Sequence, residues 1–75
     1  MKLSKRQGDI ARLLVIGHPT KQIAVALGIS VNTCYEYIRD LYRKLGVENR
    51  AACTAKLVHF GFEAETADEH RSRTE

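Results

Sequence analysis

Five polar side chains recur at helical spacing near the middle of the chain. They are Asn32, Tyr35, Glu36, Arg39 and Arg43, and a helix would place all of them on one face. Arginine presents a fork of donors that suits phosphate oxygens and guanine edges, whereas a carboxylate accepts from the exocyclic amine of cytosine. A phenol can contact a thymine methyl group or a phosphate. The set predicts non-covalent recognition of an anionic, hydrogen-bonding partner.

The residues that support catalysis or metal binding lack useful spacing. His18, His59 and His70 are far apart in the sequence, and no nucleophile has a base nearby. There is no glycine-rich phosphate loop and no carboxylate pair with a plausible cleft. We therefore expect a protein that is not an enzyme and that has no catalytic residue, no metal ligand and no cofactor.

Two cysteines and the chain length restrict the class of protein further. Cys34 and Cys53 fall within apolar helical patterns, so we expect reduced core residues in a cytoplasmic protein, with a redox-sensing pair as the alternative. No run approaches the roughly 20 apolar residues of a membrane helix, and residues 1–10 lack the apolar region of a signal peptide. The 75 residues suffice for one small domain, whose modest core makes oligomerisation plausible.

Charge is unevenly distributed along the chain. Residues 1–62 contain 10 basic and 4 acidic residues, a net charge of +6, whereas residues 63–75 contain 2 basic and 5 acidic residues, a net charge of −3. A basic compact domain favours a polyanionic partner such as nucleic acid, although a solvated basic face is also common. The C-terminal residues are expected to form an acidic, disordered tail.

Apolar periodicity and punctuation predict four helices and therefore an all-α domain. The first spans about 4–16 and begins with a Ser4–Gln7 capping-box pattern. Thr20 is expected to cap a second helix over 21–27, which Gly28 ends. The third spans 31–45 behind Ser30, and the fourth spans 50–60 behind the cap residue Asn49.

The third and fourth helices differ in their apolar faces. Cys34, Ile38, Leu41 and Leu45 form one buried seam on the third. The fourth is expected to bury one stripe and to offer a second stripe of small residues to a C2 dimer. The buried stripe is Cys53, Leu57 and Phe60; the dimer stripe is Ala51, Ala55, Val58 and Phe62. The alternative is a helix buried on most sides within one subunit.

The residues from 3 to 60 resemble the LuxR/GerE-type helix-turn-helix domain, the DNA-binding module of quorum-sensing regulators and many response regulators. The resemblance rests on an ordered set of short motifs: Leu3-Ser4, Arg6, Lys21-Gln22-Ile23-Ala24, Leu27-Gly28-Ile29-Ser30, Thr33, Arg43-Lys44-Leu45-Gly46-Val47 and Asn49-Arg50. It implies a four-helix fold with the third helix in the major groove and the fourth often used for dimerisation. The match over Lys44-Leu45-Gly46-Val47 favours this type over region 4 of a sigma factor.

The resemblance also assigns candidate DNA contacts. It implies base or phosphate contacts at Tyr35 and Arg39, with Glu36 exposed between them. It further implies phosphate contacts at Lys21, Ser30 and Thr33. Three more basic residues are expected either to contact phosphates or to carry solvated charge: Arg43, Lys44 and Arg50.

Four positions depart from the family pattern. Tyr35 stands where Lys or Arg is commonest, Tyr37 where His is frequent and Gln7 where an acid is usual, while Gly8 is unusual and should weaken its helix by about 0.5–1 kcal/mol. Glu36 is expected to read a base, to face solvent, or to pair with Arg39 or Arg43.

These observations lead to one main hypothesis and one alternative. We expect a sequence-specific DNA-binding transcriptional regulator that binds double-stranded DNA as a homodimer. The alternative is an interaction module that antagonises another helix-turn-helix regulator through its fourth helix. Another regulator and RNA polymerase are further candidate partners, and no membrane partner is expected.

Overall fold

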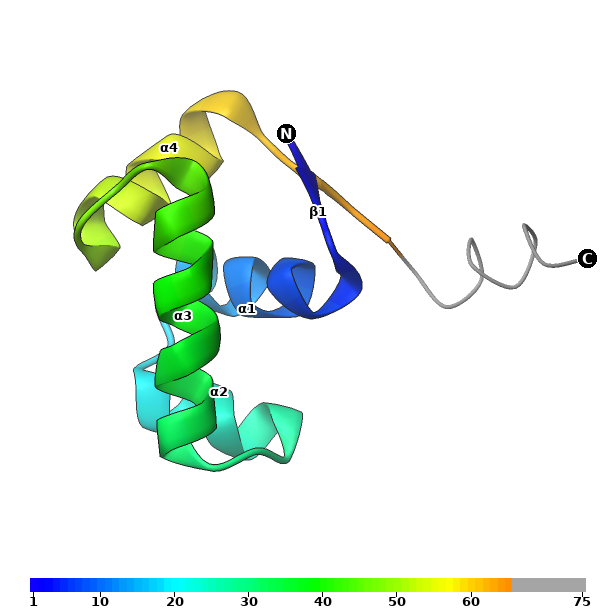
Figure 1. Ribbon diagram of the computed structural model, residues 1–75, viewed down its shortest axis with the longest axis vertical. Helices are drawn as coiled ribbons and strands as arrows, with labels where there is room; N and C mark the ends of the chain where they lie inside the picture. The colour runs from blue at the N-terminus through cyan, green and yellow to red at the C-terminus, as the bar shows by residue number, and fades with distance from the viewer. Residues whose placement is uncertain (66–75) are drawn as a thin grey trace, which may run out of the picture.

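The computed structural model describes residues 1–65 and confirms the expected all-α, four-helix fold. The elements are β1 (Lys2–Leu3), α1 (Lys5–Ile16), α2 (Thr20–Leu27), α3 (Val31–Leu45), α4 (Arg50–Phe60) and β2 (Glu63–Ala64). Helix α3 forms the long axis of the molecule (Figure 1). Helix α1 crosses behind it, with α2 towards one end of α3 and α4 towards the other (Figure 1). This arrangement leaves one long side of α3 uncovered.

Local capping explains where most helices begin. The Ser4 hydroxyl accepts from the Gln7 backbone N–H at 3.2 Å, and the Ser4 N–H donates to Gln7 Oε1 at 2.9 Å. The Asn49 side chain accepts from the Ala52 N–H at the start of α4. Such caps pair backbone donors that would otherwise lack a partner inside the helix.

The prediction that Thr20 caps α2 is wrong by one residue. Thr20 is the first residue of the helix, and Pro19 occupies the cap position without a side-chain hydrogen bond. The Pro19 carbonyl already accepts from the Ile23 N–H at 3.0 Å, so helical hydrogen bonding starts one residue earlier. At its other end α2 stops at Gly28, whose φ of 67° is a left-handed conformation that glycine adopts at little cost.

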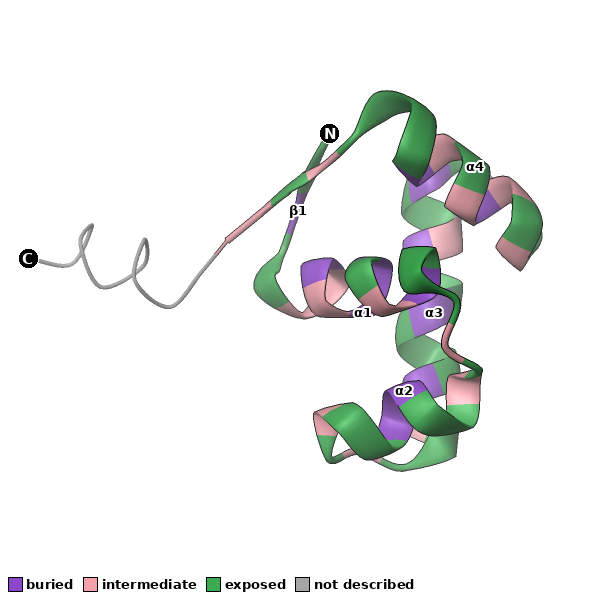
Figure 2. Ribbon diagram, turned by 180° about the vertical axis from the view of Figure 1, so that it is seen from behind, coloured by how far each residue is buried: buried purple, intermediate pink, exposed green. Residues whose placement is uncertain are grey.

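The core lies where the four helices meet. The predicted seam of α3, Cys34, Ile38, Leu41 and Leu45, is confirmed as buried. Residues from the other elements close around it: Leu3, Ile10, Ala11, Leu14, Ile23, Ala24, Cys53 and Leu57. Figure 2 shows the buried residues on the facing sides of the helices. This packing fixes which face of α3 points outward.

Phe60 corrects the prediction for the buried stripe of α4. Cys53 and Leu57 are buried as expected, but the Phe60 side chain is 64% exposed. Leu57 is the last buried residue of the helix, and Phe60, the final residue of α4, lies one turn past it. The ring instead makes an edge contact with His59, at 4.6 Å between ring centroids.

A short parallel β pair joins the two ends of the described chain. Glu63–Ala64, expected to belong to a disordered tail, pairs with Lys2–Leu3. The Glu63 N–H donates to the Met1 carbonyl at 2.7 Å. The remainder of the predicted tail, residues 66–75, lies outside the described residues.

Gly8 has a packing role that the sequence did not indicate. It is buried on α1, and a Cβ atom at this position would lie 2.2 Å from the Cβ atom of Ala64. Two carbon atoms cannot approach so closely, because their favourable separation is about 3.5–4.0 Å. The absence of a side chain at Gly8 therefore lets β2 lie against α1.

Candidate nucleic-acid interface

The outward face of α3 is the principal candidate surface. Asn32, Tyr35, Glu36, Arg39 and Arg43 are all exposed, on the side of the helix opposite the buried seam. Figure 1 shows this helix uncovered along its length. An exposed helix face of this kind can enter the major groove, which is wide enough to admit one α-helix.

Four of these exposed side chains have no partner within the described part of the chain. Within residues 1–65, Asn32, Tyr35, Glu36 and Arg39 make no side-chain hydrogen bond or ion pair. The pairing of Glu36 with Arg39 or Arg43 that the spacing allows is therefore not formed. Donors and acceptors on this face remain available to a partner.

Arg43 differs from the other members of this face. Its Nη1 atom lies 3.2 Å from Asp40 Oδ1, and both side chains are mostly exposed. An exposed pair of this type contributes about 0–1 kcal/mol, so a phosphate could replace the carboxylate at little cost.

At the start of α3 the Ser30 hydroxyl caps the helix, and the Thr33 hydroxyl can still donate to a partner. The Ser30 hydroxyl accepts from the Thr33 N–H at 3.0 Å and donates to Thr33 Oγ1 at 2.9 Å. Both roles of the Ser30 hydroxyl serve the cap, whereas the Thr33 hydroxyl keeps its own proton for an external acceptor. Lys21, in the first turn of α2, is exposed and has no side-chain partner within the described chain.

Lys44 and Arg50, expected near phosphates, make contacts within the fold. Lys44 Nζ donates to Gln7 Oε1 at 3.4 Å. Arg50 is half-buried, and its Nη2 atom donates to the carbonyls of Leu14 and His18 at the end of α1. Arg50 therefore gives the His18 carbonyl a donor and adds a second donor to the Leu14 carbonyl, which also accepts from the Gly17 N–H, so this side chain has a structural role.

Two further basic residues hold the helices around α3, and the sequence analysis gave neither this role. Lys56 Nζ donates to the Leu45 carbonyl at 2.6 Å, which connects α4 to the C-terminal end of α3. The Arg6 guanidinium lies 5.9 Å from the centre of the Tyr37 ring, a cation–π contact between α1 and α3. Spacing along one helix could not reveal these contacts, because each joins residues of two different helices.

The exposed face of α4 forms a second candidate surface. Ala51 and Ala55 are exposed, and Val58 is 65% exposed. Phe62, expected on the same stripe, is half-buried and packs against the core. We therefore define the α4 face as Ala51, Ala55 and Val58.

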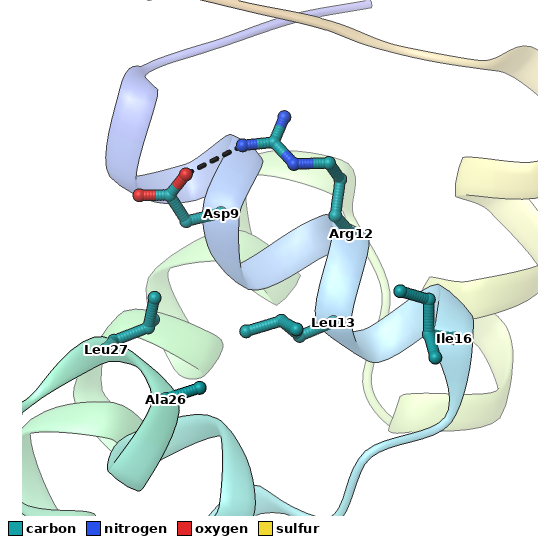
Figure 3. Close-up of a pocket in the computed structure, with 6 residues that line it drawn as sticks. All are labelled: Asp9, Arg12, Leu13, Ile16, Ala26 and Leu27. Atoms are coloured by element: carbon teal, nitrogen blue, oxygen red, sulfur yellow. Dashed lines mark hydrogen bonds and ion pairs between the residues drawn. The ribbon is translucent and has the colours of Figure 1, made fainter.

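Two hollows of the described chain lie beside α2. One of about 340 Å³ lies between α1 and α2 (Figure 3), where Leu13, Ile16, Ala26 and Leu27 line it and an Asp9–Arg12 ion pair sits at its edge. Its polar groups are already paired with each other. Within residues 1–65 no group of three or more His, Cys, Asp or Glu side chains could hold a metal ion. No helix in that range is long and apolar enough to cross a bilayer.

The two thiols are free and fully buried. Burial raises the pKa of Cys34, and burial likewise raises the pKa of Cys53 against an opposing effect of Arg50. Both groups are therefore protonated near neutral pH. Because the thiolate is the reactive form, these cysteines are better suited to packing than to redox sensing.

Comparison with known proteins identifies the family. The chain is 37% identical over 59 residues to the spore germination protein GerE of Bacillus subtilis (strain 168), and the match covers 79% of this chain and 80% of GerE. It is 44% identical over 52 residues to the nitrate/nitrite response regulator protein NarP of Escherichia coli (strain K12), covering 69% of this chain and 24% of NarP. The chain spans about a quarter of the length of NarP and of two other relatives.

No solved structure is a significant match. A family model described as bacterial regulatory proteins, luxR family, matches residues 1–57, which is most of the chain. This chain therefore belongs to the luxR family of bacterial regulatory proteins, a family of DNA-binding transcriptional regulators and not of enzymes.

Proposed function

We propose that this chain regulates transcription as a homodimer that places α3 of each subunit in the major groove of double-stranded DNA. The observation that carries the proposal is the outward face of α3, where Asn32, Tyr35, Glu36 and Arg39 have no partner within residues 1–65. Solubility alone does not require four unpartnered hydrogen-bonding side chains on one uncovered helix face, so this face favours a binding role. Family membership supplies the partner that such a face would bind.

Each side chain has a distinct role in this proposal. Arg39 contacts a guanine edge or a phosphate, and Asn32, Tyr35 and Glu36 lie beside it in the groove. Lys21 and the Thr33 hydroxyl contact the phosphate backbone, where they position the protein without reading sequence. Arg43 joins them by exchanging Asp40 for a phosphate. Ser30 contributes by capping α3, and Lys44 lies in the last turn of the same helix.

The α4 face supports the dimer. Ala51, Ala55 and Val58 are small or apolar, and they leave space for a close approach between two helices. A twofold axis through this face would make the same patch serve both subunits. The two α3 helices would then meet successive major grooves at about 34–36 Å, one turn of DNA.

Selection of bound sequences from random DNA, followed by footprinting, tests the groove assignment. Arg39→Ala should weaken operator binding by about 1–3 kcal/mol, because one base or phosphate contact is lost. Arg12→Ala is the matched control, since it removes the same charge from an exposed position on α1. Equal losses in the two variants would contradict the assignment of α3 to the groove.

Salt dependence separates this function from the alternative of an antagonist that acts through α4. Binding through phosphates should weaken steeply between about 50 and 200 mM salt. A chain that is not retained on DNA even at low salt, and that instead forms a stable complex with another helix-turn-helix regulator, would favour the antagonist.

Sedimentation tests the dimer separately. The wild-type chain should sediment with twice its chain mass at micromolar concentration, and Val58→Asp should give monomers because a carboxylate would be buried without a partner. Val25→Asp is the matched control, since Val25 is 76% exposed on α2. A wild-type chain that is monomeric throughout this range would refute the dimer.

A further inference from the structure

The acidic residue in the middle of the α3 face is the feature that DNA binding alone does not explain. Glu36 is exposed and lies on the outward side of the helix, between Tyr35 and Arg39. A carboxylate placed against a polyanion is repelled by the phosphates, and this repulsion lowers affinity for DNA of any sequence. Its position therefore needs a compensating contact.

Within the fold, Glu36 receives no such compensation. The described helices contain three acidic residues, and the other two are paired. Asp9 lies 2.7 Å from Arg12 and 3.2 Å from Lys5, and Asp40 lies 3.2 Å from Arg43. Glu36 has no ion pair within residues 1–65, even though Arg39 follows one turn later. The carboxylate thus keeps its full charge and both acceptor oxygens for a partner.

The chemistry of a carboxylate restricts what it can accept in the major groove. An ionised glutamate only accepts hydrogen bonds, so it is repelled by the acceptor edges of guanine (N7 and O6) and by O4 of thymine. Adenine offers an amine beside an acceptor at N7, whereas cytosine offers its N4 amine without an acceptor of its own. Cytosine is therefore the base whose edge best matches Glu36.

We infer that Glu36 is a specificity-determining residue that selects a cytosine in each half-site. The inference rests on the proposed function, because it assigns a base to the same surface. Arg39 lies three residues further along α3, a rise of about 4.5 Å, which compares with about 3.4 Å for one base-pair step. The selected cytosine should therefore lie within one or two base pairs of the base or phosphate that Arg39 contacts.

The inference also explains how an acid can be retained on this face. Glu36 lowers affinity for every sequence through repulsion and recovers part of that affinity only at sites with an amine in the correct position. Its contribution is to the ratio of specific to non-specific binding, which is the quantity that matters among many competing sites.

The test compares wild type with Glu36→Gln and Glu36→Ala on a selected operator in which each base pair is varied in turn. Wild type should prefer cytosine over the other bases by about 5- to 10-fold at one half-site position. Glu36→Ala should lose that preference while binding non-specific DNA more tightly. Glu36→Gln should shift the preference towards adenine, whose N6 and N7 suit an amide.

Glu48→Gln is the matched control. Glu48 is an exposed acid in the turn between α3 and α4, so this variant removes the same charge away from the outward face of the helix. It should leave the base preference at every position unchanged. Circular dichroism of each variant should match wild type, because none of the substituted side chains is buried.

Two results would overturn the inference, and they differ in what else they overturn. Sequence-specific binding by wild type with no position that prefers cytosine, or with the same base preferences in Glu36→Ala, would remove the role of Glu36 and leave the proposed function intact. Failure of wild type to bind any DNA at low salt would overturn the proposed function and the inference with it.

Discussion

Replacing Gly8 by alanine tests the contact between α1 and β2. Two effects oppose each other at this position. Alanine should favour the helical conformation of α1 by about 0.5–1 kcal/mol relative to glycine. Its Cβ atom, however, would lie 2.2 Å from that of Ala64, so one of the two elements must move by more than an ångström.

The steric effect should decide whether Gly8→Ala lowers or raises the free energy of unfolding. Overpacking of a well-packed site costs about 1–3 kcal/mol, which exceeds the helical gain. Because β2 is only two residues long, it can lift away, and this possibility limits the loss. The difference between the two effects is about 0–2.5 kcal/mol, and we expect Gly8→Ala to lower the free energy of unfolding by about 1–2 kcal/mol within that range. For a domain of this size the melting temperature should fall by about 4–16 °C.

A double-mutant cycle separates the contact from the helix propensity. Ala64→Gly alone should cost about 0.5–1 kcal/mol through the flexibility of glycine in a strand. In Gly8→Ala/Ala64→Gly the methyl group has moved from one element to the other, so the clash is gone and stability should return close to wild type. The coupling energy should exceed about 1 kcal/mol, within the range for residues in contact.

Urea unfolding followed by far-ultraviolet circular dichroism gives these values. With an m value near 1 kcal/mol/M, about the lower end for small proteins, each kcal/mol should shift the midpoint by about 1 M. If Gly8→Ala were more stable than wild type and the two substitutions were additive, β2 would not rest on Gly8. Gly8 would then only lower the helical stability of α1, as the sequence alone predicts.

Three other predictions concern interactions that hold the fold. Arg50→Ala should lower the free energy of unfolding by about 1–3 kcal/mol, because the part-buried His18 carbonyl loses its donor and the Leu14 carbonyl loses one of two, and denaturant titration measures this loss. Asn49→Ala should cost about 1 kcal/mol by removing the cap of α4, and the same titration should show a smaller loss with Asn49→Ser. Cys34 and Cys53 should resist alkylation at pH 7.5 in the native state and react once urea unfolds the chain, because burial raises both pKa values and blocks access. Rapid labelling of the folded protein, followed by mass spectrometry, would contradict that assignment.

The sequence was sufficient to predict the helices because their determinants are local. Ser30 and Gly46 lie directly beside α3, and its bounds agree with the prediction at both ends. The seam of α3 repeats every three or four residues, so its burial also follows from the sequence. The predicted start of α2 was late by one residue, because the prediction relied on a side-chain cap. The helix begins at Thr20, after a Pro19 carbonyl that accepts the first helical hydrogen bond, and every residue carries such a carbonyl.

The features that the sequence did not predict depend on contacts between distant residues. Gly8 and Ala64 are 56 positions apart, and nothing near either residue indicates that they touch. The same is true of Arg50 and the end of α1, a contact across 32 and 36 positions. Phe60 continues the apolar stripe of α4 in sequence, but the core ends before it. Periodicity reports which side of a helix is apolar and does not report how far the neighbouring helices extend.

Contacts within the fold also change what the basic charge of the domain implies about its affinity for DNA. Residues 1–65 contain ten lysines and arginines, and seven of them already contact groups in the fold: Lys5, Arg6, Arg12, Arg43, Lys44, Arg50 and Lys56. Arg50 and Lys56 cannot leave their carbonyls without exposing an unpaired acceptor, whereas an exposed ion pair contributes only about 0–1 kcal/mol and can exchange with a phosphate.

Net charge therefore overstates the number of cations that DNA can recruit. Lys21 and Arg39 have no partner within the described residues and lie on the elements that would approach the groove. Arg43 is the next most available, because its pair with Asp40 is exposed on the same helix. With so few free cations, discrimination has to come from the side chains that meet the base edges. A small number of free cations is consistent with an acceptor such as Glu36 on α3. A basic residue at that position would raise the affinity for every DNA sequence alike.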